Sequence, residues 1–240
     1  MIAPTKPTND HLLGIGLGLR LAAGSILLMF CTLGAYQFDG LAENFGGGLD
    51  LPGDIRKAIT LSEAFAHGFG AAAILGSLLV VAVNHRRAVW LAVLITLTSG
   101  LLANGLKSCF VRIRPHSQGK IEVVAENPSD GQTDTNLADT RNPPESTAVA
   151  EVKLVPESFW DSRQRSFPSG HAATAVALAI GLSLAFPRGW FIFGMLAVMA
   201  CIQRVSSGAH YPSDVLAGAS LSFLCAGGLV WASRFWQRDS

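Results

Sequence analysis

Two side chains near the C-terminal end of the chain have the types and the spacing of a nucleophile with its supporting acid. His210 and Asp214 are four residues apart, in the string AHYPSD. A carboxylate at this spacing can accept the imidazole Nδ1–H, which fixes the tautomer and stabilises the cationic ring. A histidine held in this way can act as a nucleophile through Nε2. Stabilisation of a helix N-terminus is the alternative role for Asp214.

A second motif, PSGH at residues 168–171, stands at the start of an apolar segment. The first turn of a helix offers free N–H groups and the positive end of the dipole, which together bind anions. Gly170 leaves room for an anion near the backbone, and Ser169 could cap the helix or donate to an oxyanion. His171 would then point at the bound group. An ordinary serine N-cap beside an interfacial histidine is the alternative.

Three cations could accompany these groups. Lys107 and Arg114 are seven residues apart in KSCFVRIRP, and they share one face if a helix continues through them. On that helix Arg112 would point elsewhere. Arg204 ends a later apolar segment. Clustered cations suit an anion such as a phosphate, although basic side chains also extend toward lipid headgroups.

The elements that position these groups are expected to be membrane helices. Half of the 240 residues are hydrophobic and 15% are charged, against about 25% charged residues in soluble domains. A helix of about 20 apolar residues spans a bilayer. We therefore expect an all-α membrane protein, a bundle of six transmembrane helices. The apolar segments run approximately over residues 12–36, 64–83, 88–106, 170–186, 190–203 and 215–232.

The charges of the short loops predict the orientation of this bundle. With the N-terminus in the cytoplasm, the positive-inside rule is satisfied, and both termini are cytoplasmic. All three chemical motifs then reach the outer face. The basic residues assigned to the cytoplasmic side are Lys6, Arg20, Arg86, Arg87, Arg188, Arg234 and Arg238, against Asp10 and Asp239.

A polar insert at residues 116–165 separates the third apolar segment from the fourth. Two strand-like stretches, 120–126 and 147–155, flank a stretch rich in turn residues. We expect a small extracytoplasmic β-hairpin or lid here, and a disordered insert is the alternative. Residues 1–240 are otherwise expected to form a single domain.

The three motifs resemble the signature of the type 2 phosphatidic acid phosphatase superfamily. K-x6-R-P at 107–115, P-S-G-H at 168–171 and R-x5-H-x3-D at 204–214 match it in order and spacing. Gln203 departs from the pattern, because serine usually precedes the arginine, and we expect a modest loss of hydrogen bonding to phosphate. The insert lies outside the resemblance.

This resemblance implies a single membrane phosphatase domain that hydrolyses a phosphomonoester or pyrophosphate without a metal or cofactor. His210 would attack phosphorus and form a phosphohistidine, and Asp214 would orient His210. His171 would protonate the leaving oxygen and then activate water. Stabilisation of charge on the phosphoryl oxygens dominates such chemistry. The groups that would hold those oxygens are Lys107, Arg114, Arg204, Ser169 and the amide of Gly170.

The expected substrate is a lipid phosphate that reaches the site from the bilayer. Candidates are phosphatidic acid, phosphatidylglycerol phosphate, undecaprenyl pyrophosphate and lipid A 1-phosphate, which places the protein in a bacterial cytoplasmic (inner) membrane. No nucleic acid or protein partner is expected. A non-enzymatic lipid-binding or transport protein with a degenerate site is one alternative. A vanadate haloperoxidase shares the motif pattern, but the membrane spans argue against it.

Three further polar residues lie in apolar segments. Glu63 and His67 are four apart, and we expect them to pair with one another rather than to line the path of a lipid. Asn104 could support the site or bond a neighbouring helix.

Overall fold

The computed structural model describes residues 9–40, 52–110, 112, 114–115 and 165–236. Apart from one isolated parallel β-bridge between Arg112 and Arg165, the regular elements in these ranges are helices. The predicted hairpin or lid lies outside the described residues. The elements are α1 (Asn9–Tyr36), α3 (Gly53–Leu61), α4 (Glu63–Ala66), α5 (Gly68–Val81), the 3-10 helix η1 (Val83–His85), α6 (Arg86–Leu106), α7 (Gly170–Ala185), the 3-10 helix η4 (Pro187–Gly189), α8 (Trp190–Ser206) and α9 (Pro212–Trp236).

Four helical stretches in the described ranges are long and apolar enough to cross a membrane: Gly16–Tyr36, Val83–Leu106, Pro187–Ser206 and Pro212–Ser233. A fifth crossing is available if the bent pair Gly53–Ala66 and Gly68–Val81 acts as one span. Helix α7 is apolar but has 16 residues, which is about 24 Å of helix. The all-helical membrane architecture is thus confirmed, with four or five candidate spans.

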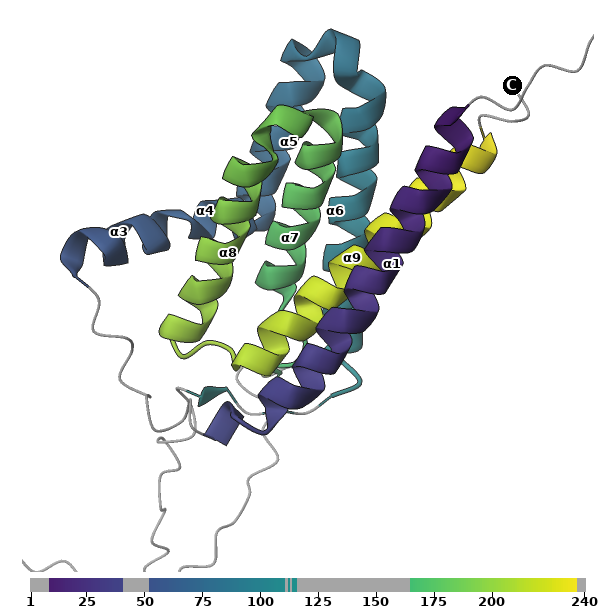
Figure 1. Ribbon diagram of the computed structural model, residues 1–240. Helices are drawn as coiled ribbons and strands as arrows, with labels where there is room; N and C mark the ends of the chain where they lie inside the picture. Colours follow the sequence, from purple (N-terminus) through teal and green to yellow (C-terminus); the bar gives the residue numbers. More distant parts are fainter. Residues whose placement is uncertain (1–8, 41–51, 111, 113, 116–164, 237–240) are drawn as a thin grey trace, which may run out of the picture.

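Helix α7 lies at the centre of the bundle, in contact with α6, α8 and α9 (Figure 1). Its buried positions are almost all small, which lets neighbouring backbones approach closely. Gly181 is the tightest case, because a Cβ there would lie 2.6 Å from the Cβ of Ala92 on α6. The buried alanines of α7 are Ala172, Ala173, Ala175, Ala177, Ala179 and Ala185.

Helices α1 and α9 lie side by side along their length (Figure 1). Gly18 and Gly227 bring the two backbones together, and Ser25 and Ser220 exchange hydrogen bonds across the pair, each hydroxyl donating to the other's carbonyl at 2.9 Å. Glycine contacts and serine hydrogen bonds of this kind are typical of packed membrane helices.

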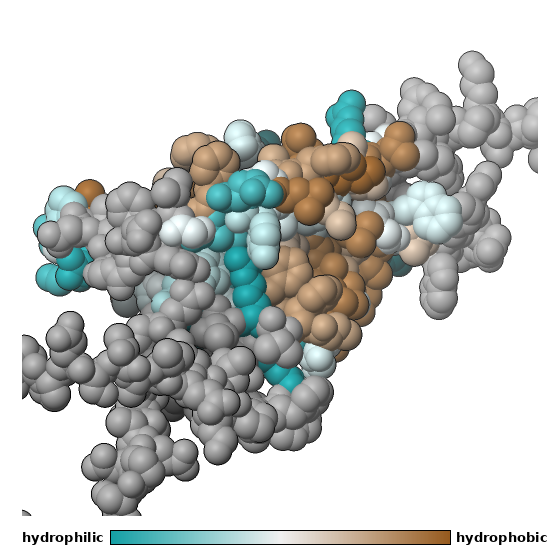
Figure 2. Space-filling view, turned by 90° about the horizontal axis from the view of Figure 1, so that it is seen from below, coloured by the Kyte–Doolittle hydropathy of each residue, from teal (hydrophilic) through white to brown (hydrophobic). Residues whose placement is uncertain are grey.

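Large apolar side chains point outward from the bundle, the arrangement expected of a surface that contacts lipid tails. Seen from the end where α9 begins, hydrophobic residues cover a broad area beside a band of hydrophilic ones (Figure 2). Examples on α1, α6 and α8 are Leu19, Leu27, Phe30, Trp90, Leu97, Leu101, Phe191, Met195 and Val198.

The second apolar segment was expected to form one helix over residues 64–83, and this prediction is wrong. The chain is extended at His67, which separates α4 from α5, and the two helical parts meet at 68°. Gly70 makes this bend possible, because a Cβ there would lie 1.8 Å from the carbonyl oxygen of Ala64. Helices α3 and α4 therefore run crosswise to the other helices and extend to one side of the bundle (Figure 1).

The helices of the bundle alternate in direction, so several of their ends meet at one end of the molecule. The C-terminal ends of α1, α6 and α8 lie there with the N-terminal ends of α7 and α9 and the bend between α4 and α5 (Figure 1). The sequence motifs stand at these helix ends, and the topology therefore gathers them.

Gly218 on α9 provides a test of this packing. A Cβ at Gly218 would lie 2.4 Å from the carbonyl oxygen of Ser169, at the start of α7. We expect Gly218→Ala to lower the free energy of unfolding by about 1–3 kcal/mol, since backbone atoms must move to admit the methyl group. Thermal unfolding of the purified protein in detergent measures the loss.

Gly228→Ala on the same helix is the matched control, because a Cβ there meets no atom within 4 Å. Equal unfolding temperatures for the two variants would contradict the close approach of α9 to α7.

Candidate active site

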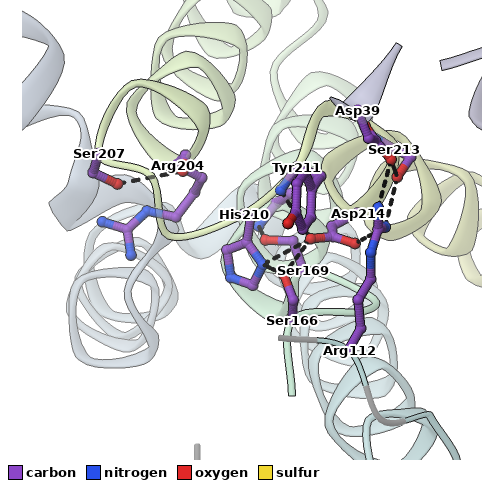
Figure 3. Close-up of polar contacts among 11 residues, drawn as sticks. Asp39, Arg112, Ser166, Ser169, Arg204, Ser207, His210, Tyr211, Ser213 and Asp214 are labelled. Atoms are coloured by element: carbon purple, nitrogen blue, oxygen red, sulfur yellow. Dashed lines mark hydrogen bonds and ion pairs between the residues drawn. The ribbon is translucent and has the colours of Figure 1, made fainter. Parts of the chain in front are cut away.

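His210 and Asp214 face one another at the start of α9, as Figure 3 shows. The Nδ1 atom of His210 lies 3.6 Å from Oδ2 of Asp214, and both side chains are buried. The hydroxyl oxygen of Ser166 lies 3.4 Å from the same Nδ1 atom. An Nδ1–H is therefore directed at two oxygen acceptors, and this tautomer leaves the lone pair of Nε2 free.

The buried Asp214 carboxylate is surrounded by donors. Its Oδ2 accepts the hydroxyl of Ser166 and the backbone N–H of Tyr211, the latter at 2.9 Å. Its Oδ1 accepts Nη1 of Arg112 at 2.6 Å. A buried charge is costly unless it is paired and hydrogen-bonded, and these contacts meet both conditions.

The environment of His210 favours the neutral imidazole. Burial lowers the pKa of His210, and the charges of Lys107 and Arg114 lower it further, whereas Asp214 acts in the opposite direction; the net shift is downward. A neutral imidazole has the lone pair that a nucleophile needs. The site therefore holds a histidine in its reactive form next to positive charge.

The PSGH motif forms the N-terminus of α7. Ser169 is the N-cap, and its Oγ accepts the backbone N–H of Ala172 at 3.4 Å. Its own N–H donates to the backbone carbonyl of Asp214 at 3.0 Å, which ties α7 to α9. The cap takes up the N–H of Ala172, and the N–H groups of Gly170 and His171 in the same first turn suit an anion.

Lys107 and Asn104 lie next to this helix start. A Cβ on Gly170 would be 3.2 Å from Oδ1 of Asn104 and 3.6 Å from Nζ of Lys107. Burial and the charge of Arg114 lower the pKa of Lys107 to about 8, against a smaller upward effect of Asp214. A nearby anion favours the charged form of a lysine whose pKa is lowered in this way.

The premise that Lys107 and Arg114 share a continuous helix is wrong. Helix α6 ends at Leu106, and Arg112 pairs in a β-bridge with Arg165 instead of extending the helix. Arg114 is nevertheless close enough to Lys107 to affect its charge. Lys107 and Arg114 are therefore close to one another, although the helix that was expected to align them ends at Leu106.

Arg204 lies in the last turn of α8, with its guanidinium buried against Glu63. Its Nη2 is 2.6 Å from Oε1 of Glu63, and its Nε donates to Oε1 of Gln203. Gln203 in turn donates from Nε2 to Glu63 at 3.4 Å. Gln203, which departs from the motif pattern, thus contacts both Arg204 and Glu63.

The expected pair of Glu63 and His67 is not formed. The backbone N–H of His67 donates to the carbonyl of Glu63 at 2.9 Å, but the Glu63 carboxylate pairs with Arg204 instead. The Nδ1 atom of His67 accepts the N–H of Phe69 at 3.4 Å, and its ring lies 5.9 Å from the ring of His171. His171 is also close enough to Arg204, His210 and Lys107 to interact with them electrostatically.

Arg112 lies next to Asp214, which the sequence did not predict. It was expected to point away from the other cations, yet its guanidinium contacts Asp214. Asp39 and Ser166, which also belong to this network, carried no signal in the sequence, because no spacing links them to the motifs. Within the described ranges, no group of three or more His, Cys, Asp or Glu side chains could hold a metal ion.

Several known proteins are similar to this chain. A lipid A 1-phosphatase from Rhizobium etli is 49% identical over 53 residues, which cover 22% of this chain and 23% of the relative. An undecaprenyl-diphosphatase from Sulfolobus acidocaldarius is 43% identical over 54 residues, 22% of this chain and 26% of the relative. The matched segments thus cover about a quarter of the length of these relatives.

The fold has a solved counterpart that extends over nearly the whole chain. The crystal structure of a transmembrane PAP2-type phosphatidylglycerolphosphate phosphatase from Bacillus subtilis aligns with a TM-score of 0.56 and 21% identity, and the match covers 93% of this chain and 97% of the other. Residues 88–238, which contain all three motifs, match the PAP2 superfamily. The chain is an integral membrane protein and belongs to the PAP2 superfamily.

Proposed function

We propose that this protein is a membrane lipid phosphatase that works through a phosphohistidine, without a metal ion. The observation that carries the proposal is the buried pair of His210 and Asp214, 3.6 Å apart, beside the cation Lys107 at the N-terminus of α7. Membership of the PAP2 superfamily and the names of the relatives support the same activity.

In the first step, Nε2 of His210 attacks phosphorus, and a P–N bond forms as the P–O bond to the lipid breaks. His171 gives its proton to the leaving oxygen, and Asp214 stabilises the cationic ring of His210. In the second step, neutral His171 takes a proton from water, the hydroxide attacks phosphorus, and the P–N bond breaks. Inorganic phosphate leaves, and His210 regains its neutral form.

The phosphoryl group is held by charges and donors on three elements. Lys107 and Arg114 follow α6, Arg204 ends α8, and the amide of Gly170 with the hydroxyl of Ser169 begins α7. Charge on the non-bridging oxygens is the main target of catalysis in phosphoryl transfer, and fixed donors stabilise it without reorganisation. Glu63, which pairs with Arg204, must then share the guanidinium with the phosphate.

The membrane arrangement proposed here has six spans, formed by α1, the bent α4–α5 pair, α6, α7, α8 and α9. Helix α7 is short for a span, but its neighbours surround it. Arg86 and Arg188 lie at the end of the bundle away from the site, which supports an extracytoplasmic site under the positive-inside rule. Both termini are then cytoplasmic, in the inner membrane, and residues 116–165 belong to the outer side of a single domain.

The proposed substrate is a phosphate or pyrophosphate at the head of a membrane lipid. Leu61 precedes Glu63 by two residues and Phe69 stacks on the ring of His67, and these side chains are 77% and 84% exposed, so apolar surface extends to the edge of the site. The names of the relatives favour lipid A 1-phosphate and undecaprenyl pyrophosphate over the other candidates, phosphatidic acid and phosphatidylglycerol phosphate.

The first test is phosphate release from these four lipids by purified protein in detergent with a chelator. We expect release from at least one of them, and we expect His210→Ala to reduce it by at least a thousandfold, since the nucleophile is removed. His85→Ala is the matched control, because His85 contacts Phe186 at the other end of the bundle.

If the protein binds lipids without hydrolysing them, neither the wild type nor the His210→Ala variant would release phosphate. Release that persists in His210→Ala would rule out the phosphohistidine route, and release that needs added metal would rule out a metal-free one.

The second test uses the lowered pKa of Lys107. In the free enzyme Lys107 loses its charge above a pH of about 8, so kcat/KM should fall above that pH, by up to tenfold per unit. Arginine stays protonated beyond pH 12. We therefore expect Lys107→Arg to move the alkaline limb upward by at least one pH unit, as measured by initial rates of phosphate release.

Lys57→Arg is the matched control, because Lys57 is exposed on α3, and it should leave the profile unchanged. An alkaline limb at the same pH in Lys107→Arg would assign that limb to another group.

A further inference from the structure

Arg112 holds two buried carboxylates with one guanidinium. Its Nη1 donates to Oδ1 of Asp214 and its Nη2 donates to Oδ2 of Asp39, both at 2.6 Å (Figure 3). Asp214 is fully buried and Asp39 nearly so. The guanidinium presents its donors in a rigid plane, so the two contacts fix the positions of both carboxylates relative to one another.

Aromatic rings hold the guanidinium in this orientation. Its central carbon lies 4.1 Å from the centre of the Tyr211 ring and 5.2 Å from that of Tyr36. Burial by itself would lower the pKa of Arg112, but the hydrogen bond to Asp39 and the charges of both carboxylates raise it overall. Arg112 is thus a permanent cation next to the pair that His210 forms with Asp214.

Asp39 connects this cation to the first turn of α9. Its Oδ1 accepts the backbone N–H of Ser213 at 3.3 Å, and its Oδ2 accepts the Ser213 hydroxyl. The same hydroxyl oxygen accepts Nη1 of Arg112 at 2.8 Å. A carboxylate at a helix N-terminus is favoured by the helix dipole, so Asp39 is stabilised where it can anchor Arg112.

The backbone of Arg112 reaches Asp214 by a second path. Its carbonyl accepts the N–H of Ser166 at 2.9 Å, and the Ser166 hydroxyl donates to Oδ2 of Asp214. One oxygen of the carboxylate is therefore fixed by the Arg112 side chain, and the other by a serine that the Arg112 backbone holds. With these donors in place, Oδ2 is the oxygen that faces His210.

We propose that Arg112, anchored by Asp39, is a positioning residue that keeps Asp214 ionised and directs its Oδ2 at His210. This inference rests on the proposed function. It gives Arg112 a different role from Lys107, Arg114 and Arg204, because its guanidinium contacts the carboxylate that faces His210. Loss of Arg112 should therefore impair the chemical step and leave binding of the phosphate largely intact.

Removal of Arg112 and removal of Asp39 should shift the pH dependence of kcat/KM in opposite directions. Removing the cation in Arg112→Gln raises the pKa of His210, which moves the acid limb of kcat/KM to higher pH. Removing the anion in Asp39→Asn moves it to lower pH. A merely structural role would not give shifts in opposite directions.

The experiment measures kcat, KM and the acid limb for the purified full chain in detergent, with the lipid phosphate on which the wild type is most active. For Arg112→Gln we expect kcat to fall at least tenfold with KM within threefold of the wild type. Arg112→Lys keeps the charge without the planar pair of donors, so it should lose kcat but retain the acid limb of the wild type. Arg87→Gln, an exposed arginine at the opposite end, is the matched control.

NMR titration of the His210 imidazole, assigned with His210→Ala, gives a readout that needs no turnover. Unchanged kcat in Arg112→Gln, or a change confined to KM, would overturn the inference. If Arg112→Gln does not fold, an unchanged kcat in Arg112→Lys, or an acid limb that does not move to lower pH in Asp39→Asn, would overturn it equally. The wild type could prove inactive while the His210 titration still shifts in opposite directions in Arg112→Gln and Asp39→Asn. That result would contradict the proposed function and support the positioning role.

Discussion

The buried carboxylate of Asp214 is the group on which the rest of the site depends. It has no exposed surface, and an unpaired charge in such a place is unfavourable by several kcal/mol. Its contacts come from separate parts of the chain: Arg112 after α6, Ser166 before α7, and Tyr211 and His210 before α9. Asp214 can therefore be ionised only when these segments have come together. The charge of the site thus depends on the assembly of the bundle.

Small residues make that assembly possible. The alanines of α7, with Gly181 and Gly218 at its contacts, let α6 and α9 approach its backbone. In a bilayer, where lipid tails are as apolar as the side chains, such close packing is a main source of helix association. The same close packing places the first turn of α7 beside the first turn of α9, and the N-terminal amides of α7 therefore lie near His210, which precedes α9.

The sequence predicted the helices well because apolar length is a strong signal in a membrane protein. It also placed the three motifs at one end, since alternating helices return each motif to the same side. It could not predict the extended residue His67, because His67 stands within the mostly apolar run AFAHGFGAAA and only the close approach of Gly70 to Ala64 reveals the bend. It also missed the roles of Asp39, Glu63 and Arg112, whose partners are set by packing between helices and not by spacing along the chain.

The ion pair of Arg204 with Glu63 affects how strongly the site can bind the proposed phosphate. The arginine is already neutralised by an internal anion at 2.6 Å, and Gln203 contacts both partners. In the proposed function, a phosphate therefore competes with Glu63 for a single guanidinium. The affinity for the phosphate would depend on the difference in free energy between the ion pair of Arg204 with the phosphate and its ion pair with Glu63. A lipid headgroup would therefore need enough negative charge to compete with a carboxylate that belongs to the protein.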